Sequence, residues 1–249
     1  MAGLEPISEA AVTLTVDAPD LYAGDMLTAV GALLHIAELL SEGTENAAEM
    51  DWVVDTISKA SPFAVALAPK PRNRMAAEAA PDITRRIVRG LSLLQETGER
   101  PSDFSDPALI AAREMSRLTR RRSVAMQLAA PGEHATITRD VGHAVDRILA
   151  PSYHAYGSVE GRLDAINVHR DRYFFVYDAL TGDSIRCSFT RSLRLEQVAQ
   201  AITERVLVEG EISYRRDGSI ASVRAEALRI FPGEADLPTA REVLGILKP

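Results

Sequence analysis

The residues best suited to binding chemistry are arginines and aromatic side chains on two neighbouring predicted strands. Tyr173, Phe175 and Tyr177 alternate along the segment RYFFVYDA, so they share one face of that strand. Arg172 opens the segment, and Arg186 lies in the next predicted strand, DSIRCSF. Aromatic rings beside cationic groups can stack on nucleic-acid bases and neutralise phosphates. We therefore treat Arg172, Tyr173, Phe175 and Arg186 as candidate ligand-binding residues.

The same segment has a second, purely structural interpretation. Phe174 and Val176 are as apolar as Tyr173 and Phe175, so the alternation does not say which set fills a core. If Tyr173 and Phe175 point inward, they pack and bind no ligand. Both alternatives stay open at the level of the sequence.

A second basic feature lies in the N-terminal half. Arg113, Arg117 and Arg121 are spaced four apart in REMSRLTRRR, a spacing that places them along one helical face. One interpretation is an anionic contact with nucleic acid or an acidic protein. The other is a solvated face whose arginines favour the negative end of the helix dipole. A further arginine cluster consists of Arg85, Arg86 and Arg89.

Catalytic and metal-binding patterns do not stand out in this sequence. The five histidines show no tight ligand spacing, and the HExxH, GxGxxG, P-loop and GxSxG patterns do not occur. The single cysteine, Cys187, alternates with Arg186 and Ser188, which predicts a core side chain. One cysteine can form neither an intrachain disulfide nor a thiolate cluster. We expect no catalytic residue, no metal, no cofactor and no enzymatic activity.

Bulk composition predicts a globular protein. The chain has 249 residues, 46% hydrophobic and 25% charged, which suffices for two ordinary domains. Its formal net charge of -7 does not favour binding to a polyanion. The N-terminal segment MAGLEPISEA lacks the features of a secretory signal, and the apolar stretches look too interrupted to span a bilayer. We therefore expect a cytoplasmic protein without membrane contact.

The first 150 residues predict an α+β domain. Apolar periodicity gives the order β-α-β-β-α-α-β-β-α, which is typical of a largely antiparallel sheet with helices. Asp20 is expected to cap the first helix, and Pro81 to open the second after a loop at 70–81. The buried positions expected in the first helix are Leu27, Val30, Leu34 and Ala37.

Strands dominate beyond Pro151. Three predicted strands, a helix and two further strands follow in that order: SVEGRLDAINV, RYFFVYDA, DSIRCSF, the helix RSLRLEQVAQAIT, RVLVEGEISYR and SIASVRAEALRIF. This order resembles that of the OB-fold, a small five-stranded β-barrel, over residues 157–232. The resemblance implies a barrel whose second and third strands commonly bind oligonucleotides. Residues 233–249 are expected to form a tail that ends in a short helix.

The whole chain also resembles uncharacterised bacterial two-domain proteins with this kind of C-terminal barrel, a resemblance that implies no activity. The fold expected is thus α+β, with a mixed helix and antiparallel-sheet domain followed by the OB-like barrel.

Charge counting shapes the functional hypothesis. Residues 157–232 contain 11 arginines, no lysine and 11 acidic residues, so the barrel carries no formal net charge. A mixed surface suits protein contacts better than a phosphate groove. The leading hypothesis is therefore a non-catalytic adaptor or regulatory protein with an unidentified protein partner. The alternative is a single-stranded nucleic-acid-binding protein that uses the second and third barrel strands, helped by the arginine helix.

Overall fold

The computed structural model describes residues 10–42, 49–58, 62–121, 124–169 and 171–231. The chain divides between Leu149 and Ala150 into two compact units. The first combines helices with a sheet, and the second is a closed β-barrel, which confirms the expected α+β class. The expected C-terminal tail, 233–249, lies outside the described residues.

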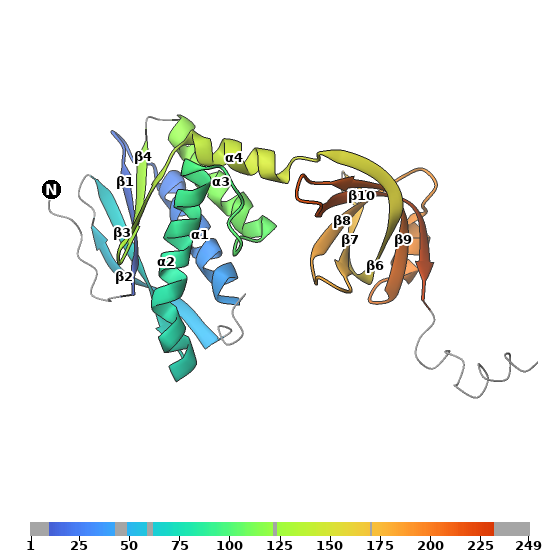
Figure 1. Ribbon diagram of the computed structural model, residues 1–249, viewed down its shortest axis with the longest axis horizontal. Coiled ribbons are helices and arrows are strands. Elements are labelled where there is room, and N and C mark those ends of the chain that lie inside the picture. Colours follow the sequence, from blue (N-terminus) through green and yellow to red (C-terminus); the bar gives the residue numbers. More distant parts are fainter. Residues whose placement is uncertain (1–9, 43–48, 59–61, 122–123, 170, 232–249) are drawn as a thin grey trace, which may run out of the picture. The chain divides into compact units, whose positions relative to one another are not determined.

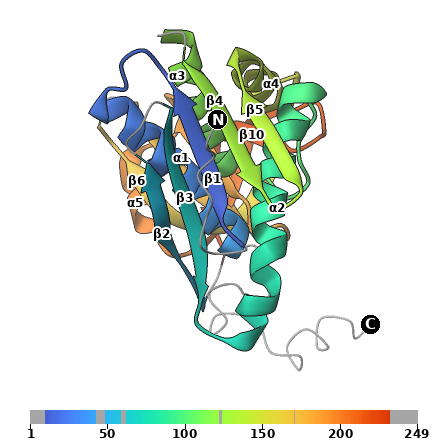
Figure 2. The same cartoon turned by 90° about the vertical axis from the view of Figure 1, so that its left-hand side faces the viewer.

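The N-terminal unit has a five-stranded antiparallel sheet with helices packed on one face (Figures 1 and 2). The strand order is β2-β3-β1-β4-β5. The strands are β1 (Val12–Asp17), β2 (Met50–Ser58), β3 (Phe63–Pro71), β4 (Ala125–Ala130) and β5 (Glu133–Ile137). The helices are α1 (Ala23–Glu42), α2 (Arg74–Glu96), α3 (Asp106–Arg121) and α4 (Arg139–Leu149). This is the element order that the sequence predicts.

Alternating strands and helical stripes build the core of this unit. Val12, Leu14 and Val16 of β1 are buried, as their alternation with threonines predicts. They meet the stripe of α2 that contains Ile83 and Ile87, and the core continues into α3 and α4. Burial of this shared apolar surface is what fixes the helices on one face of the sheet.

The expected buried face of α1 is correct only in part, because Ala37 is buried and Val30 and Leu34 pack against the core, whereas Leu27 does not. The helix begins at Ala23, so Asp20 does not cap it, and Leu27 is 67% exposed. Leu33, Ile36 and Leu40 are buried instead. The reason lies in the sequence between Asp25 and Glu38, which contains no Asp, Glu, Lys or Arg. A helix that is apolar on several faces does not reveal by periodicity which face meets the sheet.

α1 also corrects the expectation about membrane-length stretches. By length and composition it could cross a membrane, with a mean hydropathy of 1.4, and 33% of that window is buried. Its buried residues lie in the core of the N-terminal unit. Helices at the core of water-soluble domains pass the same length and composition test.

α2 begins earlier than the sequence predicts. The expected loop at 70–81 is helical from Arg74, and Pro81 lies inside the helix. The Asn73 side chain caps it by accepting a hydrogen bond from the Ala76 N–H at 2.7 Å. Alanine has the highest helix propensity, so the alanine-rich segment after Arg74 offsets the cost of the proline. Proline was therefore a misleading marker of the helix start.

The C-terminal unit is a closed barrel with the order β10-β8-β7-β6-β9 (Figure 1). Its elements are β6 (Tyr153–Asn167), β7 (Tyr173–Asp178), β8 (Ser184–Phe189), α5 (Leu195–Gln200), β9 (Arg205–Tyr214) and β10 (Ile220–Ile230). All neighbouring strands are antiparallel except β8 and β10, which are parallel. The helix between the third and fourth strands agrees with the OB-type resemblance.

The first barrel strand starts before the expected boundary at Gly157. β6 begins at Tyr153, which pairs with Tyr214 of β9. The segment 153–157 lacks a clear alternation, and long-range pairing with β9 decides its conformation. Residues 153–156, which lie between the two predicted domains, are therefore strand.

Two glycines let the barrel strands approach closely. A Cβ at Gly161 would overlap the carbonyl oxygen of Tyr177 on β7, and one at Gly210 would overlap the carbonyl oxygen of Arg224 on β10. Irregular pairing occurs near both positions, between Leu163 and Ala165 and between Ala225 and Ala227. Bulges and glycines of this kind let strands bend around a small barrel.

We predict that Gly210→Ala destabilises the protein by at least about 2 kcal/mol, because the obstructing atoms are backbone and cannot rotate away. Chemical denaturation followed by circular dichroism measures this change. Gly157→Ala is the matched control, since its nearest neighbour is the flexible end of Ile212 at 3.1 Å. Equal destabilisation by the two substitutions would contradict the role given to Gly210.

Candidate nucleic-acid interface

The barrel resolves which aromatic set of β7 faces solvent. Phe174 and Val176 are 0% exposed and lie in the barrel core with Cys187 of β8. Tyr173 and Phe175 are half-buried on the opposite, outer face, and Tyr177 is exposed. The interpretation in which Tyr173 and Phe175 fill the barrel is therefore wrong. Tyr173 and Phe175 are therefore partly accessible from the outside of the barrel.

The outer face of β7 and β8 brings the four candidate residues of the barrel into one region. Phe175 pairs with Arg186 across the two strands. The Arg186 guanidinium carbon lies 4.2 Å from the centre of the Tyr173 ring, a cation–π contact. The Tyr173 and Phe175 rings meet edge to face with centroids 5.4 Å apart. Asn167 of β6 donates a hydrogen bond to the Tyr173 hydroxyl at 2.9 Å, which fixes the ring further.

A groove of about 870 Å³ adjoins this face. Its lining includes Arg172, just before β7, Arg186 of β8, and Arg191 and Arg194 from the segment between β8 and α5. All four arginines are exposed. The remaining lining residues are Asp171, Ser188, Phe189, Thr190, Leu193, Leu195 and Glu196. The groove therefore contains twice as many arginines as acidic residues.

The segment that carries Arg191 and Arg194 is held against the barrel. The Thr190 hydroxyl donates a hydrogen bond to the Ala225 carbonyl oxygen of β10 at 2.7 Å. Leu193 is buried in the barrel core, two residues from Arg191 and one from Arg194. The two arginines thus extend from an anchored backbone, which lowers the entropy lost when they bind an anion.

Several barrel arginines outside the groove use their charge in ion pairs. Elsewhere on its surface, Arg205 pairs with Glu160, and Arg224 pairs with Glu211 at 2.8 Å. Arg229 lies near Glu209 in the same way, at 3.5 Å. Within the described part of the chain, none of the four groove arginines has a carboxylate at ion-pair distance. The barrel therefore has a locally basic groove although its formal net charge is zero.

Two of the three candidate arginines of α3 are engaged by carboxylates of the N-terminal unit. Arg113 bonds to Asp146 of α4 at 3.2 Å, and Arg117 bonds to Glu114 at 2.5 Å. The side chain of Arg121 lies outside the described residues. Such pairs are compatible with the solvated-face interpretation of this helix.

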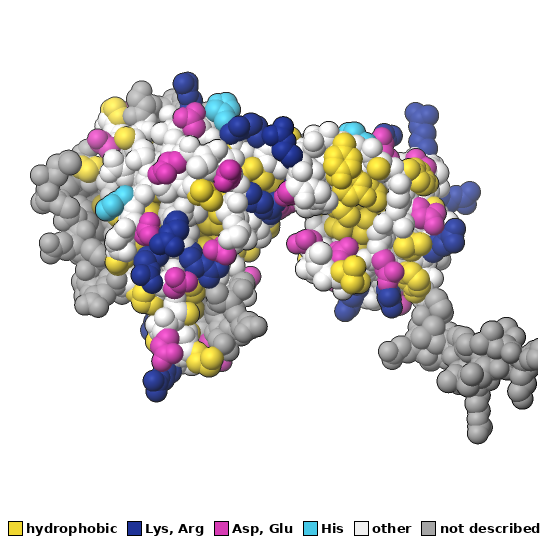
Figure 3. All heavy atoms as spheres, viewed as in Figure 1, with side chains coloured by type: hydrophobic (Ala, Val, Ile, Leu, Met, Phe, Trp, Pro, Cys, Tyr) yellow, Lys and Arg dark blue, Asp and Glu magenta, His cyan; other side chains and the backbone are white. Residues whose placement is uncertain are grey.

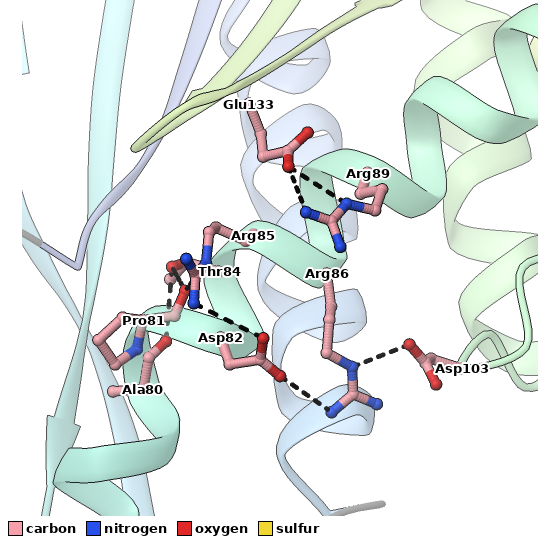
Figure 4. Close-up of polar contacts among 9 residues, drawn as sticks. All are labelled: Ala80, Pro81, Asp82, Thr84, Arg85, Arg86, Arg89, Asp103 and Glu133. Atoms are coloured by element: carbon pink, nitrogen blue, oxygen red, sulfur yellow. Dashed lines mark hydrogen bonds and ion pairs between the residues drawn. The ribbon is translucent and has the colours of Figure 1, made fainter.

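The second arginine cluster, on α2, is an ion-pair network (Figure 4). Arg85 lies 3.7 Å from Asp82, Arg86 bonds to Asp103 at 2.8 Å, and Arg89 bonds to Glu133 at 2.5 Å. The hydrogen bond from Arg86 lowers the pKa of Asp103. Figure 3 shows the resulting neighbouring charges of both signs over α2.

Sequence reasoning missed Arg191 and Arg194. Both fall in RSLRLEQVAQAIT, which the sequence predicts to be a single helix, whereas α5 starts at Leu195. The residues before it form a turn and line the groove. The only signal was the pair of arginines flanking Ser192 and Leu193, and spacing alone does not place them beside Arg186.

Cys187 is a core residue, as its alternation predicts. It is 0% exposed, and burial raises the pKa of its thiol to about 12. A thiol with that pKa is almost wholly protonated near neutral pH, so it is a poor nucleophile. Among the residues with described positions, no group of three or more His, Cys, Asp or Glu could hold a metal ion.

We predict that Cys187 reacts slowly with a disulfide reagent at pH 8 in the folded protein and rapidly in denaturant. The neighbouring position provides the control, because Ser188 faces the groove. In the double variant Cys187→Ala, Ser188→Cys, the introduced thiol should react rapidly without denaturant. Rapid labelling of Cys187 in the folded chain would contradict its burial. Absorbance of the released thiolate follows both reactions.

Comparison with known proteins identifies no family. No family model and no curated protein matches the chain. A solved structure of the S. pombe Stn1–Ten1 complex is similar over 32% of this chain and 61% of that chain, with 19% identity and a TM-score of 0.27. This chain thus covers less than two thirds of the matched chain. The expected resemblance to bacterial two-domain proteins receives no support, and the barrel assignment rests on its own strand order.

Proposed function

We propose that the C-terminal barrel is a non-catalytic module that binds single-stranded nucleic acid across β7, β8 and the adjoining groove. The observation that carries this proposal is the position of four arginines without carboxylate partners, within the described residues, beside an outward-facing pair of aromatic rings. The sequence favoured protein contacts because it shows only the total charge of the barrel. The grouping of four such arginines around one groove favours an anionic ligand at this face.

The two halves of the site suit the two parts of a nucleotide. Tyr173 and Phe175 offer ring surface for bases, and stacking on such rings contributes about 1–3 kcal/mol per base. Arg172, Arg191 and Arg194 can neutralise phosphates along the groove. A duplex hides its base faces within the stack, so an aromatic platform selects single strands.

A second candidate function, protein contact, is favoured by a different surface. Tyr153 of β6 stacks on Tyr214 of β9 with ring centroids 4.9 Å apart, and Tyr156 of β6 is exposed. Tyrosine is enriched at protein interfaces, where its ring is buried and its hydroxyl stays wet. This cluster lies on strands other than β7 and β8, so the two functions can be tested separately.

We predict that the protein binds fluorescein-labelled single-stranded oligothymidylate and oligouridylate, with affinity that falls steeply as salt increases. Arg186→Ala should weaken binding at least about tenfold, because it removes a charged contact and the cation–π support of Tyr173. Tyr173→Ala should cost about 1–3 kcal/mol of binding free energy through lost stacking. Fluorescence anisotropy titrations at two salt concentrations measure both effects.

The chain offers matched controls for this experiment. Arg224→Ala removes a barrel arginine that is already paired with Glu211, and should leave the affinity nearly unchanged. Tyr156→Ala removes an exposed ring outside the site and should behave in the same way. No binding at low salt, or equal losses in Arg186→Ala and Arg224→Ala, would refute nucleic-acid binding at this face. The protein-contact candidate would then become the leading one.

A further inference from the structure

The side chain of Asn167, the last residue of β6, is held at both ends of its amide. Its Oδ1 accepts a hydrogen bond from the His169 N–H at 2.9 Å, and its Nδ2 donates one to the Tyr173 hydroxyl at 2.9 Å. A backbone N–H can only donate, so the amide atom that faces it must be the oxygen. This bond is an Asx turn, in which an asparagine binds the backbone two residues further along the chain. The turn therefore directs the amide nitrogen of Asn167 to Tyr173.

The Tyr173 ring is supported by both its own strand and β6. Tyr173 pairs with Asn167 across β6 and β7, so the two side chains lie on the same outer face of the barrel. Phe175, the next residue of β7 on this face, meets the Tyr173 ring edge to face. Tyr173 is half-buried among these neighbours. The hydroxyl and one side of the ring are thus both held before any ligand binds.

Arg186 of β8 lies over this supported ring. Because β8 pairs Ser188 with Tyr173 and Arg186 with Phe175, Arg186 is a diagonal neighbour of Tyr173. Diagonal neighbours lie within reach of long side chains. The Arg186 guanidinium carbon is 4.2 Å from the ring centre, and the same side chain lines the groove. Among the described residues, no other groove arginine has a cation–π contact.

This contact lowers the cost of using Arg186 to bind an anion. An exposed arginine samples many rotamers, and fixing them on binding reduces the affinity. A ring that already holds the guanidinium removes part of that cost. The ring does not neutralise the guanidinium as a carboxylate would, and within the described part of the chain no carboxylate lies at ion-pair distance from Arg186. Its charge therefore remains available to a ligand.

We propose that Asn167 and the Tyr173 hydroxyl are positioning groups that hold Arg186 in place to bind a phosphate of a single strand. The inference rests on the nucleic-acid binding proposed for the barrel and assigns roles within that site. Arg186 contacts the phosphate. Asn167 orients Tyr173 through the hydroxyl, and the oriented ring holds the Arg186 side chain.

The salt dependence of binding distinguishes the phosphate contact from the positioning groups. Fluorescence anisotropy with labelled oligothymidylate over a series of salt concentrations gives the slope of log K against log salt. Arg186→Ala should make this slope shallower by about 0.7, the change expected for one phosphate contact on a single strand. Asn167→Ala and Tyr173→Phe should each weaken binding about three- to tenfold and leave the slope unchanged.

Combined substitutions test whether Asn167 acts through Arg186. Asn167→Ala with Tyr173→Phe should weaken binding no more than either change alone. In the Arg186→Ala chain, Asn167→Ala should have no further effect. A threefold or greater loss that persists without Arg186 would overturn the proposal. Val168→Ala, at a position of the same turn that is 55% exposed, is the matched control and should bind as the wild type does. Circular dichroism verifies that every variant is folded.

Nuclear magnetic resonance relaxation of the arginine Nε–H groups tests the positioning without a ligand. Arg186 should have a higher order parameter than Arg172, and Asn167→Ala or Tyr173→Phe should lower it while Val168→Ala should not. Equal order parameters for Arg186 and Arg172 in the wild type would overturn the proposal. If Arg186 is ordered through Asn167 but the chain binds no oligothymidylate, the proposed nucleic-acid function is refuted and the positioning of Arg186 is confirmed.

Discussion

Closure of the C-terminal barrel is the constraint on which its surface chemistry depends. A five-stranded barrel closes when its strands approach closely enough to bend, which glycine allows at Gly161 and Gly210. In the closed barrel, Phe174 and Val176 lie in the interior. Because successive side chains of a strand alternate, Tyr173, Phe175 and Tyr177 must then face outward. The aromatic platform is thus a consequence of how the core is filled.

The positions of the barrel arginines, and not their number, decide where the barrel surface is basic. Three of its arginines lie beside glutamates on strands β6, β9 and β10, where ion pairs use their charge locally. The arginines around the groove come from different parts of the chain and, among the described residues, meet no such partner. A surface without net charge can therefore still concentrate positive potential in one groove.

The N-terminal unit shows the opposite balance. Its arginine clusters on α2 and α3 pair with nearby acids, while apolar side chains are exposed on α1 and the edge strand β2. Apolar groups on both sides of α1 explain why this helix is so hydrophobic. One side packs on the sheet through Leu33 and Ile36, and the other presents Leu27 to solvent.

The sequence by itself determined the class of the fold, the order of the elements and the identity of most core strands. These depend on local periodicity, and the alternation of Val12, Leu14 and Val16 is an example. It also identified Tyr173, Phe175 and Arg186 as a potential site.

The sequence failed where two faces of an element were equally apolar, as in α1 and β7, because the pattern of apolar residues then does not say which face is buried. It also failed at Pro81, where neighbouring alanines and the Asn73 cap outweigh the proline. Only the tertiary structure decided which ring faces solvent, which arginine meets a glutamate, and that Arg191 and Arg194 join Arg186 in one groove, because each depends on residues brought together by strand pairing and barrel closure.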